Sequence, residues 1–150
     1  MHGEDFEIHD GVLTGLSSHI RHYADVIEIP DGVTVIPHNA ITIAIPNVEP
    51  SCYGPFDYSN PYAGEIVFPD SVICIRKMAI VFSDIVSITL GKGLERLEED
   101  SFYYCIKLAH INYRGTVAQW RAIQKHRGWD SGSGNYTVHC SDGDIKKEDA

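Results

Sequence analysis

Histidine is the residue type in this sequence that most directly suggests metal chemistry, because neutral imidazole is a common ligand of transition metals. The eight histidines are His2, His9, His19, His22, His38, His110, His126 and His139. His19 and His22 are three residues apart and could share a helix face, but no glutamate or cysteine stands beside them at ligand spacing. His139 and Cys140 are adjacent, so in a strand their side chains point to opposite faces and cannot chelate one ion. We therefore predict neither a metal site nor a cofactor.

Cysteine and serine are the candidate nucleophiles. The four cysteines are Cys52, Cys74, Cys105 and Cys140. They form no C-x-x-C pair, and their spacing fits neither a zinc ribbon nor a dense disulfide framework. We interpret them as small buried hydrophobic residues. The sequence has no G-x-S-x-G nucleophile elbow. We predict no catalytic residue, and a metal-dependent hydrolase is the least favoured functional hypothesis.

Composition narrows the range of partners. The chain has 150 residues, a net charge of −9 and 43% hydrophobic residues, which is typical of a single soluble domain. No lysine and arginine cluster offsets the acidic charge, so we expect no nucleic-acid binding. Because no apolar run reaches about 18 residues, we expect no membrane-spanning helix.

Short apolar pairs separated by one residue recur along the chain. The pairs are Phe6/Ile8, Ile27/Ile29, Ile66/Phe68, Ile88/Leu90, Ile111/Tyr113 and Val138/Cys140. Successive pairs lie 21, 39, 22, 23 and 27 residues apart, which indicates a repeated unit of about 22 residues. Side chains alternate between the faces of a strand, so each pair marks one apolar face. We expect neighbouring strands to stack and bury these faces as one continuous wall.

A turn and a second short strand follow the apolar pair in each unit. The segments PDGVTVI, PDSVICI and GKGLERL begin at Pro30, Pro69 and Gly91. Proline fixes φ and glycine tolerates positive φ, so these residues favour a turn at the start of each segment. An alanine or serine then opens a further segment, as at Ala79 and Ser101.

The best preserved unit spans residues 87–111 and reads SITLGKGLERLEEDSFYYCIKLAHI. Within it, Ser101, Phe102, Cys105 and Leu108 fit the pattern A-F-x-x-C-x-x-L. The unit resembles the BspA-like leucine-rich repeat family, whose small bacterial members also open with a hairpin similar to FEIHDGVLTGL. The tail over residues 111–145, which begins INYRGTVAQWRAI and ends YTVHCSDGDI, is similar to the exit cap of that family. The resemblance covers about residues 5–145.

The resemblance implies a mainly β protein with a short α-helix. The expected fold is a right-handed β-solenoid of the leucine-rich-repeat type, with an N-terminal hairpin cap and a C-terminal helix and strand cap. It also implies that Cys105 is buried and unreactive. A single domain over residues 1–150 would consist of repeats near 5–22, 23–64, 65–86 and 87–109, a cap over 110–145 and a tail over 146–150.

Two segments have local features of their own. Residues 41–64 form an insertion that is rich in proline, which disrupts a regular strand ladder. Its aromatic residues include Tyr53, Phe56, Tyr58 and Tyr62. They either fold back onto the apolar wall or provide a surface for recognition or for self-association into a homo-oligomer. The other segment begins at Thr116, where a capping box with Gln119 predicts a helix to about Lys125.

The outward positions of the stacked strands form the predicted binding face. These positions are Val26, Glu28, Glu65, Val67, Ser87, Thr89, His110, Asn112, Thr137 and His139. From this face we predict as binding residues Glu28, Glu65, Val67, Thr89, His110, Asn112 and His139. The ligand would be a protein or a glycan, and the alternative is a solvated sheet surface without a partner.

The sequence thus favours a non-enzymatic module for protein–protein or surface-polymer interaction. The family resemblance alone implies adhesion or host contact. The alternative is an intracellular structural scaffold that self-associates through the Tyr- and Pro-rich insertion. The opening MHGEDFEIHDG has no secretory signal pattern, so we expect a cytoplasmic location if Met1 is the native start. A secreted or cell-surface location is expected if a signal has been removed.

Overall fold

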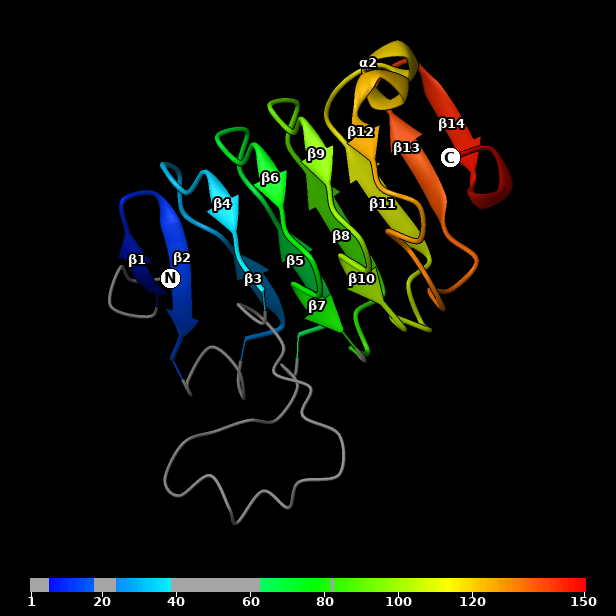
Figure 1. The fold of residues 1–150 in the computed structure, drawn as a ribbon. Helices are drawn as coiled ribbons and strands as arrows, with labels where there is room; N and C mark the ends of the chain where they lie inside the picture. The colour runs from blue at the N-terminus through cyan, green and yellow to red at the C-terminus, as the bar shows by residue number, and fades with distance from the viewer. Residues whose placement is uncertain (1–5, 18–23, 39–62, 82) are drawn as a thin grey trace.

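A computed structural model describes residues 6–17, 24–38, 63–81 and 83–150, in which two six-stranded sheets face each other (Figure 1). Sheet 1 has the strand order β1-β2-β4-β6-β9-β12, and sheet 2 has the order β14-β13-β11-β8-β5-β3. The strands of sheet 1 are β1 (Phe6–His9), β2 (Val12–Leu16), β4 (Val35–Ile36), β6 (Cys74–Ile75), β9 (Arg96–Leu97) and β12 (Gln124–Lys125). The strands of sheet 2 are β3 (Val26–Glu28), β5 (Glu65–Val67), β8 (Ser87–Leu90), β11 (His110–Tyr113), β13 (Thr137–Cys140) and β14 (Gly143–Lys146).

The first apolar residue of five of the six predicted pairs stacks in a single file across sheet 2, as the sequence predicts. The prediction is wrong for Phe6/Ile8, which lie on β1 of sheet 1, antiparallel to β2, with Ile8 37% exposed. Ile27 pairs with Ile66, Ile66 with Ile88, Ile88 with Ile111, and Ile111 with Val138, in parallel and in register. All five side chains are fully buried. Burial of this shared wall is the main driving force for the stack, because each strand has only three or four residues and cannot hide its apolar face alone.

The predicted fold class is nevertheless wrong, since no leucine-rich-repeat solenoid is found. Both large sheets are mixed: β1 and β2 are antiparallel in sheet 1, β13 and β14 are antiparallel in sheet 2, and the other pairs are parallel. The physical reason is that apolar spacing reports which face of a strand is buried but not the direction of its neighbour. The Asp10-Gly11 turn, with φ angles of 49° and 79°, reverses the chain between β1 and β2.

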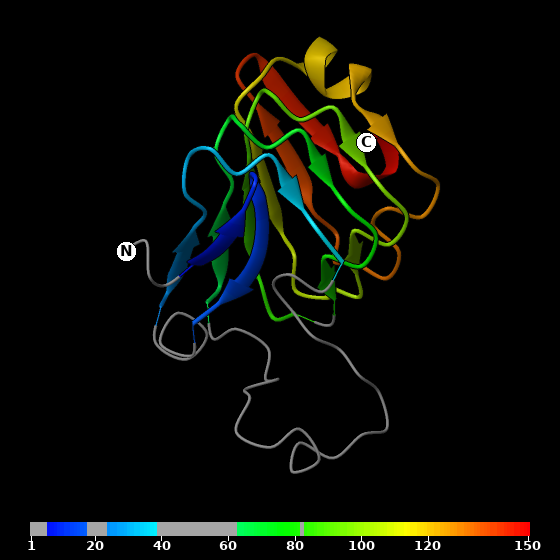
Figure 2. The same cartoon turned by 60° about the vertical axis from the view of Figure 1, so that its left-hand side comes forward.

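The core lies between the two sheets, which form opposite walls when seen from the N-terminal hairpin (Figure 2). One cluster of buried side chains includes Ile36 and Ile75 of sheet 1 and Ile66 and Ile88 of sheet 2. A third, small sheet is the parallel pair of β7 (Ile80–Val81) and β10 (Phe102–Tyr103). In chain order, each of these strands follows a strand of sheet 1 and precedes a strand of sheet 2 (Figure 1).

The predicted capping box is confirmed at helix α2 (Val117–Ala122). The Thr116 hydroxyl accepts a hydrogen bond from the Gln119 N–H, and the Gln119 side chain accepts one from the Thr116 N–H. The helix ends at Ala122 rather than near Lys125, because Ile123 is extended and Gln124–Lys125 form β12 beside β9. The pairing of β12 with β9 therefore replaces the last turn of the predicted helix.

The structure describes the predicted C-terminal tail but not most of the predicted insertion. Most of the insertion over 41–64, including Tyr53, Phe56, Tyr58 and Tyr62, lies outside the described residues. The tail over 146–150 continues β14 into a single 3₁₀ turn, η3 (Lys147–Asp149), and the Lys147 ammonium donates to the Ser133 carbonyl oxygen at 2.8 Å.

Candidate functional site

The predicted binding face lies on sheet 2, where its residues form two rows across the strands. One row runs Val26, Glu65, Ser87, His110 and Thr137, and the other runs Glu28, Val67, Thr89, Asn112 and His139. Each row alternates along its strand with the fully buried file, so both rows face away from the core. The structure thus brings these residues together on one face, and their role in binding stays a prediction.

Side chains on this face are linked in hydrogen-bonded groups. The Asn112 amide donates to the Ser87 hydroxyl at 3.0 Å. His110 Nδ1 and His139 Nε2 are 3.0 Å apart, and His139 Nδ1 is 3.1 Å from a carboxylate oxygen of Asp144 on β14. The sequence prediction included both histidines but missed Asp144, because only the antiparallel β13–β14 pairing places Asp144 opposite His139.

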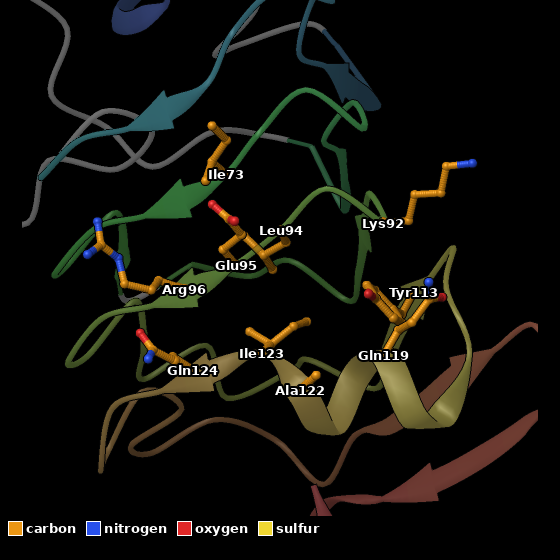
Figure 3. A pocket seen from close by; sticks show the side chains of 10 residues that line it. All are labelled: Ile73, Lys92, Leu94, Glu95, Arg96, Tyr113, Gln119, Ala122, Ile123 and Gln124. Atoms are coloured by element: carbon orange, nitrogen blue, oxygen red, sulfur yellow. The ribbon is translucent and has the colours of Figure 1, made fainter.

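A pocket of about 630 Å³ lies on the outer side of sheet 1, beside α2 (Figure 3). Its lining residues are Ile73, Lys92, Leu94, Glu95, Arg96, Tyr113, Gln119, Ala122, Ile123 and Gln124. Four parts of the chain position them: the segment leading into β6, the turn and strand of β9, the end of β11 at Tyr113, and the helix with β12. Its volume is typical of a site for a small molecule or a few residues of a peptide.

The pocket combines apolar and charged side chains. Ile73 is 40% exposed there, which is unusual for an isoleucine next to a strand, while Leu94 and Ile123 are nearly buried. Glu95 lies between Lys92 and Arg96 (Figure 3). The side chains of Lys92 and Arg96 extend in opposite directions (Figure 3). Within the described residues, neither cation has a carboxylate within ion-pair distance. The pocket therefore presents apolar side chains with one cation on each side of Glu95.

A second pocket, of about 570 Å³, adjoins the first at Arg96 and Gln124, which line both. Its other lining residues are Lys77, Leu97, Glu98, Glu99, Lys125 and His126. Lys125 is already engaged, because its ammonium donates to the Trp120 carbonyl oxygen at 2.6 Å and lies 4.6 Å from the centre of the Trp120 ring. Burial lowers the pKa of Lys125. We call the two adjoining pockets together the sheet 1 groove.

The thiols of the described residues are poor nucleophiles. Burial raises the pKa of Cys74 and Cys140, and it raises the pKa of Cys105 to about 12. Cys105 donates to the Ile80 carbonyl oxygen, and Cys74 lies 3.7 Å from both the Arg96 guanidinium and a Glu98 carboxylate oxygen. All three cysteines are free. At neutral pH these sulfurs stay protonated, which disfavours nucleophilic chemistry.

Sequence reasoning missed the sheet 1 groove because it followed the first strand of each unit. The signal was present in the second strand, where Ile73 and Glu95 occupy equivalent positions just before Cys74 and Arg96, which pair across β6 and β9. An isoleucine at an outward position among charged neighbours marks an exposed apolar spot. The contribution of α2 and β12 could not be seen, since it depends on the helix ending at Ala122.

Comparison with known proteins adds no relative. No protein-family model, no curated protein and no solved structure matches the chain. The resemblance to the BspA-like leucine-rich repeat family therefore stays a prediction. In the described part of the chain, no helix has the length and apolar character needed to cross a membrane.

Proposed function

We propose that this protein is a non-enzymatic binding module that holds an extended polypeptide segment in the sheet 1 groove. The segment would place a large apolar side chain between two carboxylates. The observation that carries the proposal is the exposed Ile73 in a pocket that also contains Lys92 and Arg96, neither of which has a carboxylate within ion-pair distance among the described residues.

The apolar side chains of the pocket would provide much of the binding free energy. Ile73 is 40% exposed, and Leu94 and Ile123 line the same pocket. Covering the exposed part of one isoleucine side chain contributes on the order of 1 kcal/mol, and the ligand side chain that covers it contributes a similar amount. A ligand with an aliphatic or aromatic side chain therefore gains affinity at this position.

The cations would determine which apolar ligand binds. The chain carries a net charge of −9, so an acidic partner is repelled by most of the surface. Lys92 and Arg96 reverse that preference locally, because a carboxylate placed between apolar contacts forms a charge-assisted hydrogen bond with either. The groove also contains Glu95, which would repel a carboxylate at its centre and favour carboxylates at the two ends.

Side-chain amides favour a polypeptide over a small carboxylic acid. Gln119 uses its amide oxygen to accept from the Thr116 N–H, which leaves its NH₂ group able to donate to a peptide carbonyl. Gln124 lies on β12, the edge strand of sheet 1, and has both a donor and an acceptor. Amide groups at these two places match the alternating donors and acceptors of an extended backbone.

The other functional hypotheses remain predictions. A protein or glycan ligand on the outer face of sheet 2 would use a different surface from the sheet 1 groove. Self-association through the aromatic insertion concerns residues outside the described part of the chain.

The test is a titration of the isotope-labelled full chain, followed by NMR, with a short peptide that alternates glutamate with leucine or phenylalanine. A second peptide with lysine in place of every glutamate controls for apolar contact alone. Arg96→Glu removes the cation and Ile73→Ser removes the apolar contact. Lys107→Glu is the matched control, because it makes the same change in net charge at an exposed loop position outside the groove.

We expect chemical-shift changes at the lining residues with the acidic peptide only. Arg96→Glu and Ile73→Ser should each weaken binding about tenfold, which corresponds to the loss of one good contact. Lys107→Glu should bind as the wild type does. The proposal is wrong if the acidic peptide fails to bind, if both peptides bind equally, or if the shifts map to the outer face of sheet 2.

A further inference from the structure

Two imidazole rings lie side by side on the outer face of sheet 2. Neither histidine lines the sheet 1 groove. His110 lies on β11 and His139 on the adjacent parallel strand β13, where His139 is in register with Asn112. The two histidines are therefore diagonal neighbours. His110 Nδ1 and His139 Nε2 are 3.0 Å apart, and the ring centres are 5.2 Å apart with 29° between the ring planes.

A carboxylate fixes the second of these rings. Asp144 lies opposite His139 in the antiparallel β13–β14 pair, and its oxygen is 3.1 Å from His139 Nδ1. Because an ionised carboxylate can only accept, His139 Nδ1 carries the proton of this hydrogen bond. The lone pair of neutral His139 is then on Nε2, the atom that faces His110. The arrangement orients one imidazole lone pair toward the other ring.

We propose that His110 and His139 form a two-imidazole site for a divalent transition metal ion, with Cu²⁺ held most tightly. A metal–imidazole bond is about 2.0–2.1 Å long, so two nitrogens on one ion lie roughly 2.9 Å apart at a right angle and roughly 3.3 Å apart in a tetrahedron. The observed 3.0 Å lies between these values. Because the ring centres are only 5.2 Å apart, the two nitrogens point almost directly at each other. Each ring must therefore turn by about 35–45° for its lone pair to point at the ion.

Asp144 is the independent observation that supports a metal. Histidines that bind metals almost always donate their other ring N–H to a carboxylate, a backbone carbonyl or a water, which fixes the tautomer and raises the basicity of the ligating nitrogen. His139 has this arrangement. Its side chain is 36% exposed, so an ion can reach the site from solvent.

The limited protein ligand set determines the class of metal. Among the described residues, no group of three or more His, Cys, Asp or Glu side chains is arranged to hold an ion. Water would therefore complete the coordination shell. With two imidazoles as the only protein ligands, affinity follows the intrinsic order in which Cu²⁺ exceeds Ni²⁺ and Zn²⁺, and oxygen-preferring Mg²⁺ and Ca²⁺ are excluded.

Every proton is accounted for when the ion binds. In the metal-free pair, the N–H at His110 Nδ1 donates a hydrogen bond to the lone pair on His139 Nε2. When the ion binds, this proton moves to His110 Nε2 through water, and both facing nitrogens give lone pairs to the metal. No proton is released by a pair that is neutral at the start, and no oxidant or reductant is needed.

The test is a calorimetric titration of the full chain with Cu²⁺, and separately with Zn²⁺, in a buffer that does not bind metals. His110→Asn and His139→Asn each remove one ligand, and Asp144→Asn removes the carboxylate behind the site. His126→Asn is the control, because His126 is an exposed histidine whose Nδ1 is 2.9 Å from the Arg127 carbonyl oxygen. Histidines elsewhere in the chain remain in every variant, so their contribution cancels in each comparison.

We expect His110→Asn and His139→Asn each to abolish one equivalent of Cu²⁺ binding. Asp144→Asn should keep the equivalent but weaken it about tenfold, as is usual when such a partner is removed. His126→Asn should bind as the wild type does. Electron paramagnetic resonance of the wild-type Cu²⁺ complex should show two nitrogen ligands.

Three results would overturn the proposal. The first is a wild type that does not bind Cu²⁺. The second is a double His110→Asn/His139→Asn variant that retains every equivalent. The third is a loss in His126→Asn as large as the loss in His110→Asn. Metal-free thermal unfolding of each variant serves to show that the fold is intact, which is expected because both histidines lie on a solvent-facing surface.

Discussion

Asp100 and Gly128 hold the same left-handed backbone conformation and are joined by a hydrogen bond. The Asp100 N–H donates to the Gly128 carbonyl oxygen at 3.1 Å, and the φ angles are 54° and 79°. Met78, with φ of 55°, continues the row by donating to the Asp100 carbonyl oxygen at 3.2 Å. Successive units thus turn the same corner with the same backbone geometry, although only one of them uses glycine there.

Met78→Gly should stabilise the fold. A side chain with a Cβ in the left-handed region costs roughly 1–2 kcal/mol, whereas glycine costs about 0.5–1 kcal/mol through the entropy of the unfolded chain. The net gain expected is about 0.5 kcal/mol in the free energy of unfolding, measured by urea denaturation. Lys77→Gly, at the preceding residue without a positive φ, is the control and should only destabilise. A loss of stability in Met78→Gly would contradict the strain argument.

Gly93→Ala should destabilise the fold severely, because a Cβ at this position would overlap the Asp70 carbonyl oxygen. The contact is with the backbone of the preceding unit, so no side-chain rotation can relieve it. We expect a loss of about 2 kcal/mol or more, or an insoluble product. Gly64→Ala is the matched control, since nothing lies within 4 Å of its added Cβ. Equal thermal midpoints for the two variants would contradict the close stacking of the turns.

Ser101→Ala should cost about 1 kcal/mol of stability through the loss of a buried hydrogen bond. The Ser101 hydroxyl is fully buried and lies 2.6 Å from the Glu98 carbonyl oxygen and 3.1 Å from the Ile75 carbonyl oxygen. Ala79 occupies the equivalent position in the preceding unit, so an alanine methyl group fits such a site. Calorimetric unfolding measures the change, and Ala79→Ser is the reverse comparison. An unchanged midpoint in Ser101→Ala would mean that the hydroxyl contributes nothing.

Cys105 should make the fold sensitive to alkali. Burial raises the pKa of its thiol from 9.0 to about 12, so the unfolded chain loses this proton first as the pH rises. Deprotonation therefore favours the unfolded state, and the contribution present below pH 9 is lost progressively as the pH rises toward 12. At a pH midway between these values the loss is roughly 2 kcal/mol.

The measurement for Cys105 is the pH dependence of urea unfolding in wild type and in Cys105→Ala. The variant is expected to be less stable at neutral pH because of the cavity, but to lose less stability between neutral pH and pH 10.5. Tyr136 and Cys140 also have raised pKa values and are unchanged in the variant, so the difference between the two curves isolates Cys105. Parallel curves would show that the thiol is not buried in the folded state.

The sequence by itself determined the local and periodic features of this protein. The spacing of Ile27, Ile66, Ile88 and Ile111 fixed which side chains share the buried wall, because burial of an apolar face needs only the right period and a neighbour. The capping box at Thr116 and Gln119 likewise depends on residues three apart.

The tertiary structure decided what depends on strand direction and on contacts between distant segments. The reversal at Asp10-Gly11 made sheet 1 mixed, and the antiparallel pairing of β13 with β14 made sheet 2 mixed. The pairing of β12 with β9 ended α2 at Ala122 and formed the groove around Ile73. Asp144 met His139 only because β14 returns antiparallel to β13. Periodicity records what each strand must bury, whereas the neighbours that complete a site are chosen by how the whole chain packs.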